Sequence, residues 1–225
     1  MTLMERRRAL MGANKKTRLP AGYQEVEWIG CSGDQYIQTG YVIGTPTSLL
    51  CKVGFMTQNA GTADRPVVWL RNENTATDPE TTYKFPNIYN GKIEIAGYGI
   101  NNTNAFSAQD DEKIEMEFDY RDGHQIIKRS GVSDLTYSNN KPTEASTKRI
   151  RLLRSDKQPQ SDNWNQSFFS GRLYYFYYRQ DDVDVFDMIP CYRVSDGEIG
   201  MYDLVSNTFF TNAGTGTFTK GADVN

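Results

Sequence analysis

Three carboxylates alternate along residues 112–120, the stretch EKIEMEFDY. If this segment is a strand, Glu115, Glu117 and Asp119 share one face, with neighbours about 6.6 Å apart. Glycosidases use pairs of carboxylates separated by about 5 to 9 Å. The residues between these three are apolar, however, which is typical of an ordinary strand with one solvated face. We therefore interpret the row as solvated and keep a glycan hydrolase as an alternative.

A single histidine and a run of aspartates are the other residues that suggest chemistry. His124 follows the turn pair Asp122-Gly123, and a lone histidine at a hairpin corner favours a surface residue over a nucleophilic relay. The run RQDDVDVFD offers oxygen ligands of the type that calcium prefers, but not the spacing of a dedicated calcium loop. We interpret it as a charged hairpin tip and expect no cofactor, with calcium as the alternative; its aspartates are Asp181, Asp182, Asp184 and Asp187.

The cysteines Cys31, Cys51 and Cys191 are odd in number and match no metal-ligand spacing. We expect buried thiols formed in a reducing cytoplasm. No apolar run is long enough to span a membrane, and the first residues do not read as a signal peptide.

Aromatic residues offer candidate ligand contacts in two places. Alternation along LYYFYYR places Leu173, Tyr175 and Tyr177 on one face of a strand and Tyr174, Phe176 and Tyr178 on the other. Such rings form either a sugar-binding platform or the packed middle of a sheet. The long polar loop at 154–167 holds an aromatic that contacts either a ligand or the sheet edge. The candidate glycan or partner contacts are Asn163, Trp164 and Tyr178.

These residues must be positioned by strands, because apolar alternation and turn pairs recur from residue 23 onward without helical crossovers. The turn pairs are Asn90-Gly91, Asp122-Gly123, Asp196-Gly197 and Ser206-Asn207. The predicted strands are 23–30, 35–42, 48–56, 66–71, 83–90, 92–99, 113–120, 124–130, 148–154, 168–179, 184–193, 198–205 and 208–212. Short strands at near-regular spacing predict a two-sheet antiparallel β-sandwich or jelly roll.

The first 18 residues differ from the rest in charge and period. They hold six basic residues against Glu5, about +5, which leaves about −8 for the remaining chain because the whole sequence has a net charge of −3. An acidic body argues against nucleic-acid binding by the domain. The segment 2–11 has a helical period, and Gly12 ends it. We predict a short N-terminal helix or arm at 1–18 and one domain at 19–225. The candidate anchoring residues are Leu3, Met4, Arg6, Arg7, Arg8, Leu10 and Met11.

Two blocks of sequence resemble a known family. The segments LPAGYQEVEWIGCSGDQYIQTGY and FSGRLYYFYYRQDDVDVFDMIPCYRVSDGEIGMYDLVSNTFFTNAGTGTF are similar to concanavalin A-like (LamG-like) jelly-roll domains found in phages and prophages of gut bacteria. Most of the matching positions look like fold determinants: Gly33, Tyr36, Ile37, Thr39, Gly40, Pro190, Cys191, Arg193, Asp196, Gly197, Gly200, Tyr202, Asp203, Asn212, Gly214, Gly216 and Phe218. The Glu-x-Asp-x-x-Glu motif of the family's glucanases is absent.

The resemblance implies a non-enzymatic phage virion surface protein, on the capsid or on the tail or baseplate. Residues 1–18 would dock it onto other virion proteins, and the jelly roll would face solvent and contact host glycans. It would be a homo-oligomer or part of a symmetric assembly, without a membrane or direct nucleic-acid role. A free or cell-surface carbohydrate-binding module is the first alternative. The C-terminal segment 191–218 would close the sandwich and lie beside YQEVEWIG.

Overall fold

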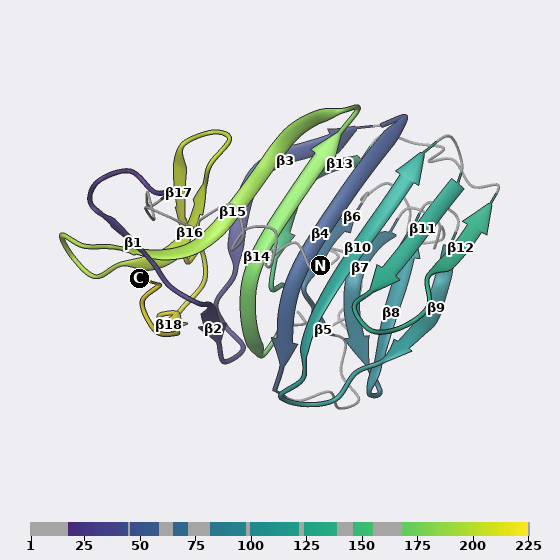
Figure 1. Ribbon diagram of the computed structural model, residues 1–225, viewed down its shortest axis with the longest axis horizontal. Helices are drawn as coiled ribbons and strands as arrows, with labels where there is room; N and C mark the ends of the chain where they lie inside the picture. Colours follow the sequence, from purple (N-terminus) through teal and green to yellow (C-terminus); the bar gives the residue numbers. More distant parts are fainter. Residues whose placement is uncertain are drawn as a thin grey trace.

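Antiparallel strands in two sheets form the computed structural model of this protein (Figure 1). It describes residues 18–44, 46–58, 65–71, 82–97, 100–121, 124–138, 146–154 and 168–224. The predicted short helix at residues 2–11 lies outside these ranges. The described residues include no helix that is long and apolar enough to cross a membrane.

The larger sheet contains most strands of the C-terminal half of the chain together with three strands from residues 23–57. Its neighbouring strands are, in spatial order, β12 (Leu135–Ser138), β11 (His124–Arg129), β10 (Lys113–Arg121), β4 (Ser48–Thr57), β14 (Gly171–Gln180), β15 (Val183–Arg193), β16 (Ile199–Asp203) and β17 (Thr208–Thr211). Three short strands pair beside this path, namely β1 (Tyr23–Glu25), β2 (Ile29–Cys31) and β18 (Thr219–Lys220).

The smaller sheet lies behind the larger one in Figure 1. Its order is β3 (Ile37–Gly44), β13 (Ser146–Leu152), β6 (Val68–Arg71), β7 (Thr82–Tyr89), β8 (Lys92–Gly97) and β9 (Ile100–Ser107), and β5 (Arg65–Pro66) pairs with β7. Strands far apart in the sequence are neighbours in space, as where β14 pairs with β4 on one side and with β15 on the other.

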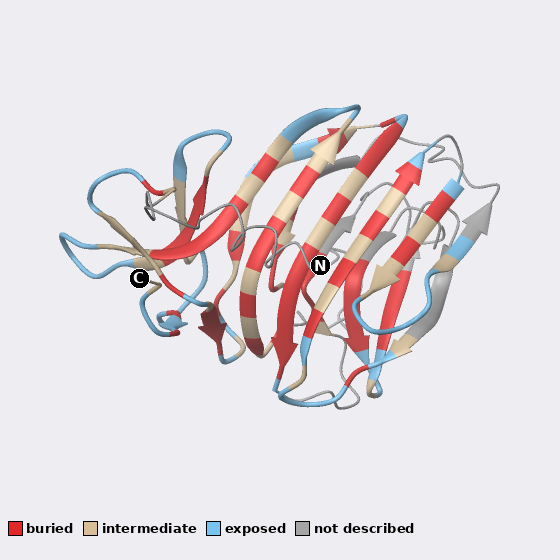
Figure 2. Ribbon diagram, viewed as in Figure 1, coloured by how far each residue is buried: buried red, intermediate tan, exposed pale blue. Residues whose placement is uncertain are grey.

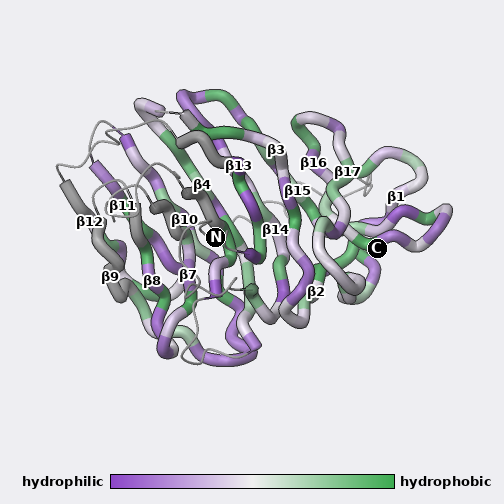
Figure 3. Tube along the Cα trace, turned by 180° about the vertical axis from the view of Figure 1, so that it is seen from behind, coloured by the Kyte–Doolittle hydropathy of each residue, from purple (hydrophilic) through white to green (hydrophobic). Residues whose placement is uncertain are grey.

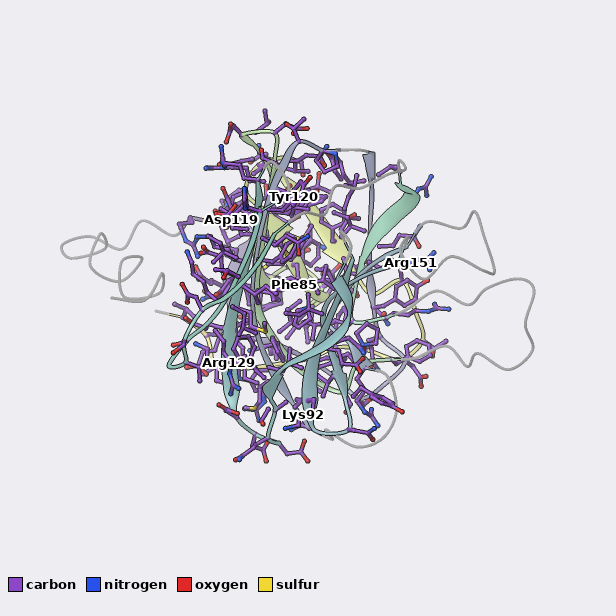
Figure 4. All side chains as sticks on the ribbon, turned by 90° about the vertical axis from the view of Figure 1, so that its right-hand side faces the viewer. Phe85, Lys92, Asp119, Tyr120, Arg129 and Arg151 are labelled. Atoms are coloured by element: carbon purple, nitrogen blue, oxygen red, sulfur yellow. The ribbon has the colours of Figure 1, made fainter. Side chains whose placement is uncertain are left out.

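The core lies between the two sheets because apolar residues alternate with polar ones along the strands. Figure 2 shows this as alternating buried and half-buried positions along β4, β10 and β14, and Figure 3 shows the matching alternation of hydropathy from behind. The ring centroids of Phe85 on β7 and Phe118 on β10 lie 5.1 Å apart across the sandwich. In Figure 4, Phe85 and Tyr120 lie between the layers, whereas Asp119 and Arg151 lie outside them.

The aromatic strand β14 departs from the simple alternation expected of it. Its pairing with β4 shifts in register between Leu173 and Tyr175, which marks a β-bulge. The extra residue moves the following side chains to the other face, so Leu173, Phe176 and Tyr178 all join the core. Tyr177 is half-buried, and its hydroxyl donates to Asp184 at 2.5 Å. The predicted division of the rings into two faces is therefore wrong across the bulge.

The C-terminal segment closes the fold against the first strands, as the sequence predicts. Strand β1 pairs with β15, and β18 pairs with β2. The amide of Glu27 donates to the carbonyl of Ala222 at 2.9 Å, and a bridge joins Val26 to Asp223. Asn207 and Gly197 have φ of 56° and 74°, so two of the predicted turn pairs lie in tight turns.

A second, smaller core lies where β15 extends beyond the sandwich. It contains Leu19, Ile189, Cys191 and Tyr202, and the ring of Tyr23 lies 4.9 Å from that of Tyr202. The first described residue, Arg18, is also fixed, because its guanidinium donates to Glu25 at 3.1 Å. All three cysteines are free and buried, as predicted, and burial raises the pKa of the Cys31 thiol to about 12.

Candidate functional site

The alternating carboxylates lie on the outer face of β10, where each contacts lysines or solvent. The carboxylate of Glu117 forms ion pairs with Nζ of Lys52 at 2.7 Å and with Nζ of Lys128 at 2.8 Å. The carboxylate of Glu115 lies 3.3 Å from Nζ of Lys113. Burial alone would raise the pKa of Glu117, but the two lysines outweigh it and lower the pKa. A catalytic acid needs a raised pKa, so this environment supports the solvated-face interpretation.

The aspartate run forms the tip of the β14–β15 hairpin, as predicted. Asp181 and Asp182 have φ of 48° and 61°, the conformation of a two-residue turn. The Oδ1 atom of Asp181 accepts from the amide and hydroxyl of Thr47, at 2.8 and 2.7 Å, so it holds the start of β4. Within the described ranges, no group of three or more histidines, cysteines or acids is placed to hold a metal ion. His124 is exposed at its hairpin.

Of the predicted contact residues, the structure describes only Tyr178. Its side chain is 1% exposed in the core, and its hydroxyl donates to Gln180 at 2.9 Å. A ring in this position does not reach a ligand at the surface, because the bulge in β14 turns it inward. Asn163 and Trp164 lie outside the described residues. The anchoring residues also lie outside them: Leu3, Met4, Arg6, Arg7, Arg8, Leu10 and Met11.

A group of arginines and rings on the outer side of the smaller sheet is the strongest candidate for a ligand site. We call Tyr36, Arg149, Arg151, Arg154 and Phe168 the arginine cluster. The Cζ atom of Arg154 lies 4.4 Å from the centroid of the Tyr36 ring and 5.0 Å from that of Phe168. The Cζ atom of Arg151 lies 5.9 Å from the Tyr36 ring. One guanidinium therefore contacts two aromatic rings beside a second guanidinium.

Strand alternation and an isolated bridge place these side chains together. Ile150 and Leu152 point into the core and are fully buried, so Arg149 and Arg151 lie on the outer face of β13. Directly after the strand, Leu153 has φ of 73° and is fully buried, and Arg154 then forms a bridge with Phe168. This turn brings Arg154 beside residues that are far away in the sequence.

The C-terminal segment holds Tyr36 in place. The side-chain oxygen of Asn212 accepts from the amide of Tyr36 at 3.1 Å and from that of Gly214 at 2.9 Å. The amide of Ala213 donates to the carbonyl of Tyr36 at 2.9 Å. Gly214 packs so closely that an added Cβ would lie 3.0 Å from Cδ1 of the Tyr36 ring. The segment that closes the sandwich therefore also positions one ring of the cluster.

The cluster concentrates positive charge. Burial lowers the pKa of Arg151; Tyr36 acts in the opposite direction, and the neighbouring charges of Arg154 and Arg149 lower the pKa further. Guanidinium groups nevertheless stay protonated at any physiological pH. In the described part of the chain, neither Arg149 nor Arg154 forms an ion pair with a carboxylate. On the larger sheet, by contrast, arginines pair with acids: Arg121 with Asp182, Arg129 with Glu112, Arg179 with Asp184, and Arg193 with Asp196.

Sequence reasoning did not single out this cluster. It predicted a strand at 148–154 and treated Tyr36 as a fold determinant. The alternation of Arg149 and Arg151 was a usable signal, because it places two cations on one face of a strand. The contact with Tyr36 and Phe168 depends on long-range pairing, which the local pattern does not show.

Comparison with solved structures shows the fold. Domains LG4-5 of the mouse laminin α1 chain match with a TM-score of 0.50 at 11% identity, over 71% of this chain and 44% of that one. A candidate carbohydrate binding protein from Bacteroides ovatus matches with a TM-score of 0.55 at 11% identity, over 89% of this chain and 62% of that one. A tailspike protein domain of bacteriophage CBA120 matches with a TM-score of 0.44 at 10% identity, over 77% and 30%.

This chain spans less than two thirds of each of these matched chains. No protein-family model and no curated protein matches the sequence. Together with the two antiparallel sheets, the first two structures confirm the predicted all-β fold, a two-sheet antiparallel jelly-roll sandwich.

Proposed function

We propose that this protein is a non-enzymatic carbohydrate-binding jelly roll whose ligand contacts the arginine cluster. The observation that carries the proposal is the Arg154 guanidinium, which lies against the rings of both Tyr36 and Phe168. Saccharides are recognised by aromatic faces together with a few well-placed hydrogen-bond donors. Tyr36, Arg154 and Phe168 supply both on half-buried side chains that the fold holds in place.

Two further observations support this reading. The similar Bacteroides ovatus structure is described as a candidate carbohydrate binding protein, and it shares the fold over most of this chain. The carboxylates that would serve a hydrolase sit on the other sheet, and Glu117 among them is neutralised by two lysines. Both observations fit a protein that binds a carbohydrate without hydrolysing it.

The full chain should bind a subset of immobilised glycans on an array, and Arg154→Ala should lose that binding. The reason is that alanine removes both the donors and the partner that orders the two rings. Circular dichroism and urea unfolding establish that the variant is folded. Glu115→Gln combined with Glu117→Gln is the matched control and should bind normally. A wild-type chain that binds no glycan, or one that releases reducing ends from a bound glycan, would refute the proposal.

We further propose that residues 1–18 hold this domain on a phage particle, where the jelly roll faces solvent. The basic charge of this segment and the family resemblance of the domain support the proposal. So does the fixed exit point of the segment, because Arg18 bonds to Glu25 and Leu19 is buried in the second core. An anchor that is joined to the domain at an ordered residue also fixes where the domain lies on the particle.

Deletion of residues 1–17 should abolish incorporation into particles while the domain keeps its fold and its glycan binding. The deletion spares Arg18 and Leu19, whose contacts belong to the domain. Particles purified from cells that express either form would be compared by immunoblot. Equal incorporation of both forms would exclude the anchor and favour a free or cell-surface binding module.

A further inference from the structure

Two arginines of the cluster, Arg149 and Arg154, carry positive charge that no carboxylate of the described residues pairs with. Arg154 contacts rings instead of carboxylates, and Arg149 is exposed without an ion pair among the described residues. Ring faces attract a cation but leave its forked donors free for a second partner. An anion is the partner that gains most from such a fork, because two parallel charge-assisted hydrogen bonds form at once.

The small size of the cluster limits the class of molecule that can carry the bound anionic group. Nucleic acids bind through many phosphate contacts spread along a basic surface. Here the three arginines stand in a body whose charge is about −8, counted from the sequence without its first 18 residues. On the larger sheet several cations pair with acids, as where Lys52 and Lys128 share Glu117. A long polyanion would therefore be repelled beyond the cluster, whereas one charged sugar unit would not.

We propose that the ligand is an acidic saccharide whose anionic group is bound by the guanidinium of Arg154, while the ring of Tyr36 or Phe168 contacts the sugar face. Arg149, on the same outer face of the smaller sheet, adds positive charge that attracts this group. This inference rests on the proposed carbohydrate binding. The anionic group is a carboxylate, as in a uronic acid, or a sulfate or phosphate ester. A guanidinium fork fits all three.

Two pairs of probes test the inference with the full chain. The first is galacturonic acid and its methyl ester; the second is glucose 6-sulfate and glucose. We expect the charged member of at least one pair to bind and its neutral partner to bind about 10-fold or more weakly. Added salt should weaken the charged interaction, because it screens exposed charges. Which pair responds identifies the anionic group.

The variant Arg149→Glu tests the site without disturbing the core, because this side chain is exposed. It should weaken binding of the charged probe by about 10-fold or more, since it replaces attraction with repulsion. Arg121→Glu is the matched control: it makes the same change in net charge on an exposed residue of the larger sheet and should change the affinity by less than about 2-fold. Arg154→Lys keeps the charge but removes the fork, so it should also weaken binding.

Each outcome decides between the two proposals. Equal binding of charged and neutral probes would overturn the acidic ligand and leave carbohydrate binding intact. No binding to these probes or to any glycan of the array would overturn both. A single-stranded oligonucleotide that binds as tightly as the charged saccharide would overturn the preference for sugars. An unchanged affinity in Arg149→Glu would place the acidic ligand elsewhere on the protein.

Discussion

Gly214→Ala is expected to destabilise the fold by about 3 kcal/mol and to weaken ligand binding in the same protein. An added Cβ would lie 2.0 Å from the carbonyl oxygen of Asp34 and 3.0 Å from the ring of Tyr36. The oxygen belongs to the backbone, so no side-chain rotation relieves the contact. The Asn212 hydrogen bonds that hold Tyr36 must then lengthen, and the ring moves away from Arg154. Urea unfolding and titration with the charged saccharide measure the two effects.

Gly131→Ala is the matched control for this prediction. Gly131 has φ of 84° and no atom within 4 Å of an added Cβ, so alanine there suffers backbone strain without a clash. It should cost about 1 kcal/mol and leave binding unchanged. If Gly214→Ala lost stability but bound the ligand with full affinity, the C-terminal segment would close the sandwich without positioning the site.

The sequence predicts the strands whose side chains alternate clearly. Strand β10 is the best example, because Ile114, Met116, Phe118 and Tyr120 are buried and the carboxylates between them are not. The turn pairs at 90–91, 196–197 and 206–207 were equally readable, since asparagine and glycine favour the positive φ that a tight turn requires. The predicted turn pair at 122–123 lies outside the described residues. The polar strand β9 was missed: its sequence INNTNAFS contains no apolar alternation.

The bulge in β14 shows where local patterns fail. A period of two assigns Tyr175 and Tyr177 to the same face as Leu173, and one extra residue reverses the assignment for the rest of the strand. Nothing in the sequence LYYFYYR marks this position, because both faces carry rings. The bulge is set by pairing with β4, where Gly54 leaves room for the ring of Tyr175. Tyr178 was therefore predicted as a surface contact and lies in the core.

The candidate site depends even more on distant pairing. Tyr36, Arg154 and Phe168 meet because β3 pairs with β13 and because a bridge joins Arg154 to Phe168. The stretch CYRVSDGEIGMYDLVSNTFFTNAGTGTF looks like a closure in the sequence, and the structure confirms that role through β15 to β18. Its contact with Tyr36 adds a second role, which connects stability and binding through Asn212 and Gly214.

Asp203→Ala is expected to cost about 3 to 5 kcal/mol, a loss of the size seen when a buried hydrogen-bonded network is broken. The Asp203 side chain is fully buried at the end of β16. Its Oδ1 atom accepts from the amide of Asp187 at 2.8 Å, and its Oδ2 atom accepts from the amide and hydroxyl of Ser206 at 2.9 and 2.6 Å. Alanine leaves these donors without an acceptor and removes the carboxylate that ties the β16–β17 turn to β15. Thermal and urea unfolding measure the loss.

Asp196→Ala is the control that distinguishes the buried Asp203 carboxylate from a general need for aspartate in the turns of the C-terminal segment. Asp196 also accepts from a backbone amide, that of Glu198 at 3.2 Å, and it pairs with Arg193. Its side chain is exposed, so water replaces the lost acceptor and the loss of stability should be much smaller. Asp203→Asn should fall between the two alanine variants, because the amide oxygen keeps one acceptor in place. Equal losses for Asp196→Ala and Asp203→Ala would mean that turn geometry, and not the burial of the Asp203 carboxylate, holds β16 and β17 against β15.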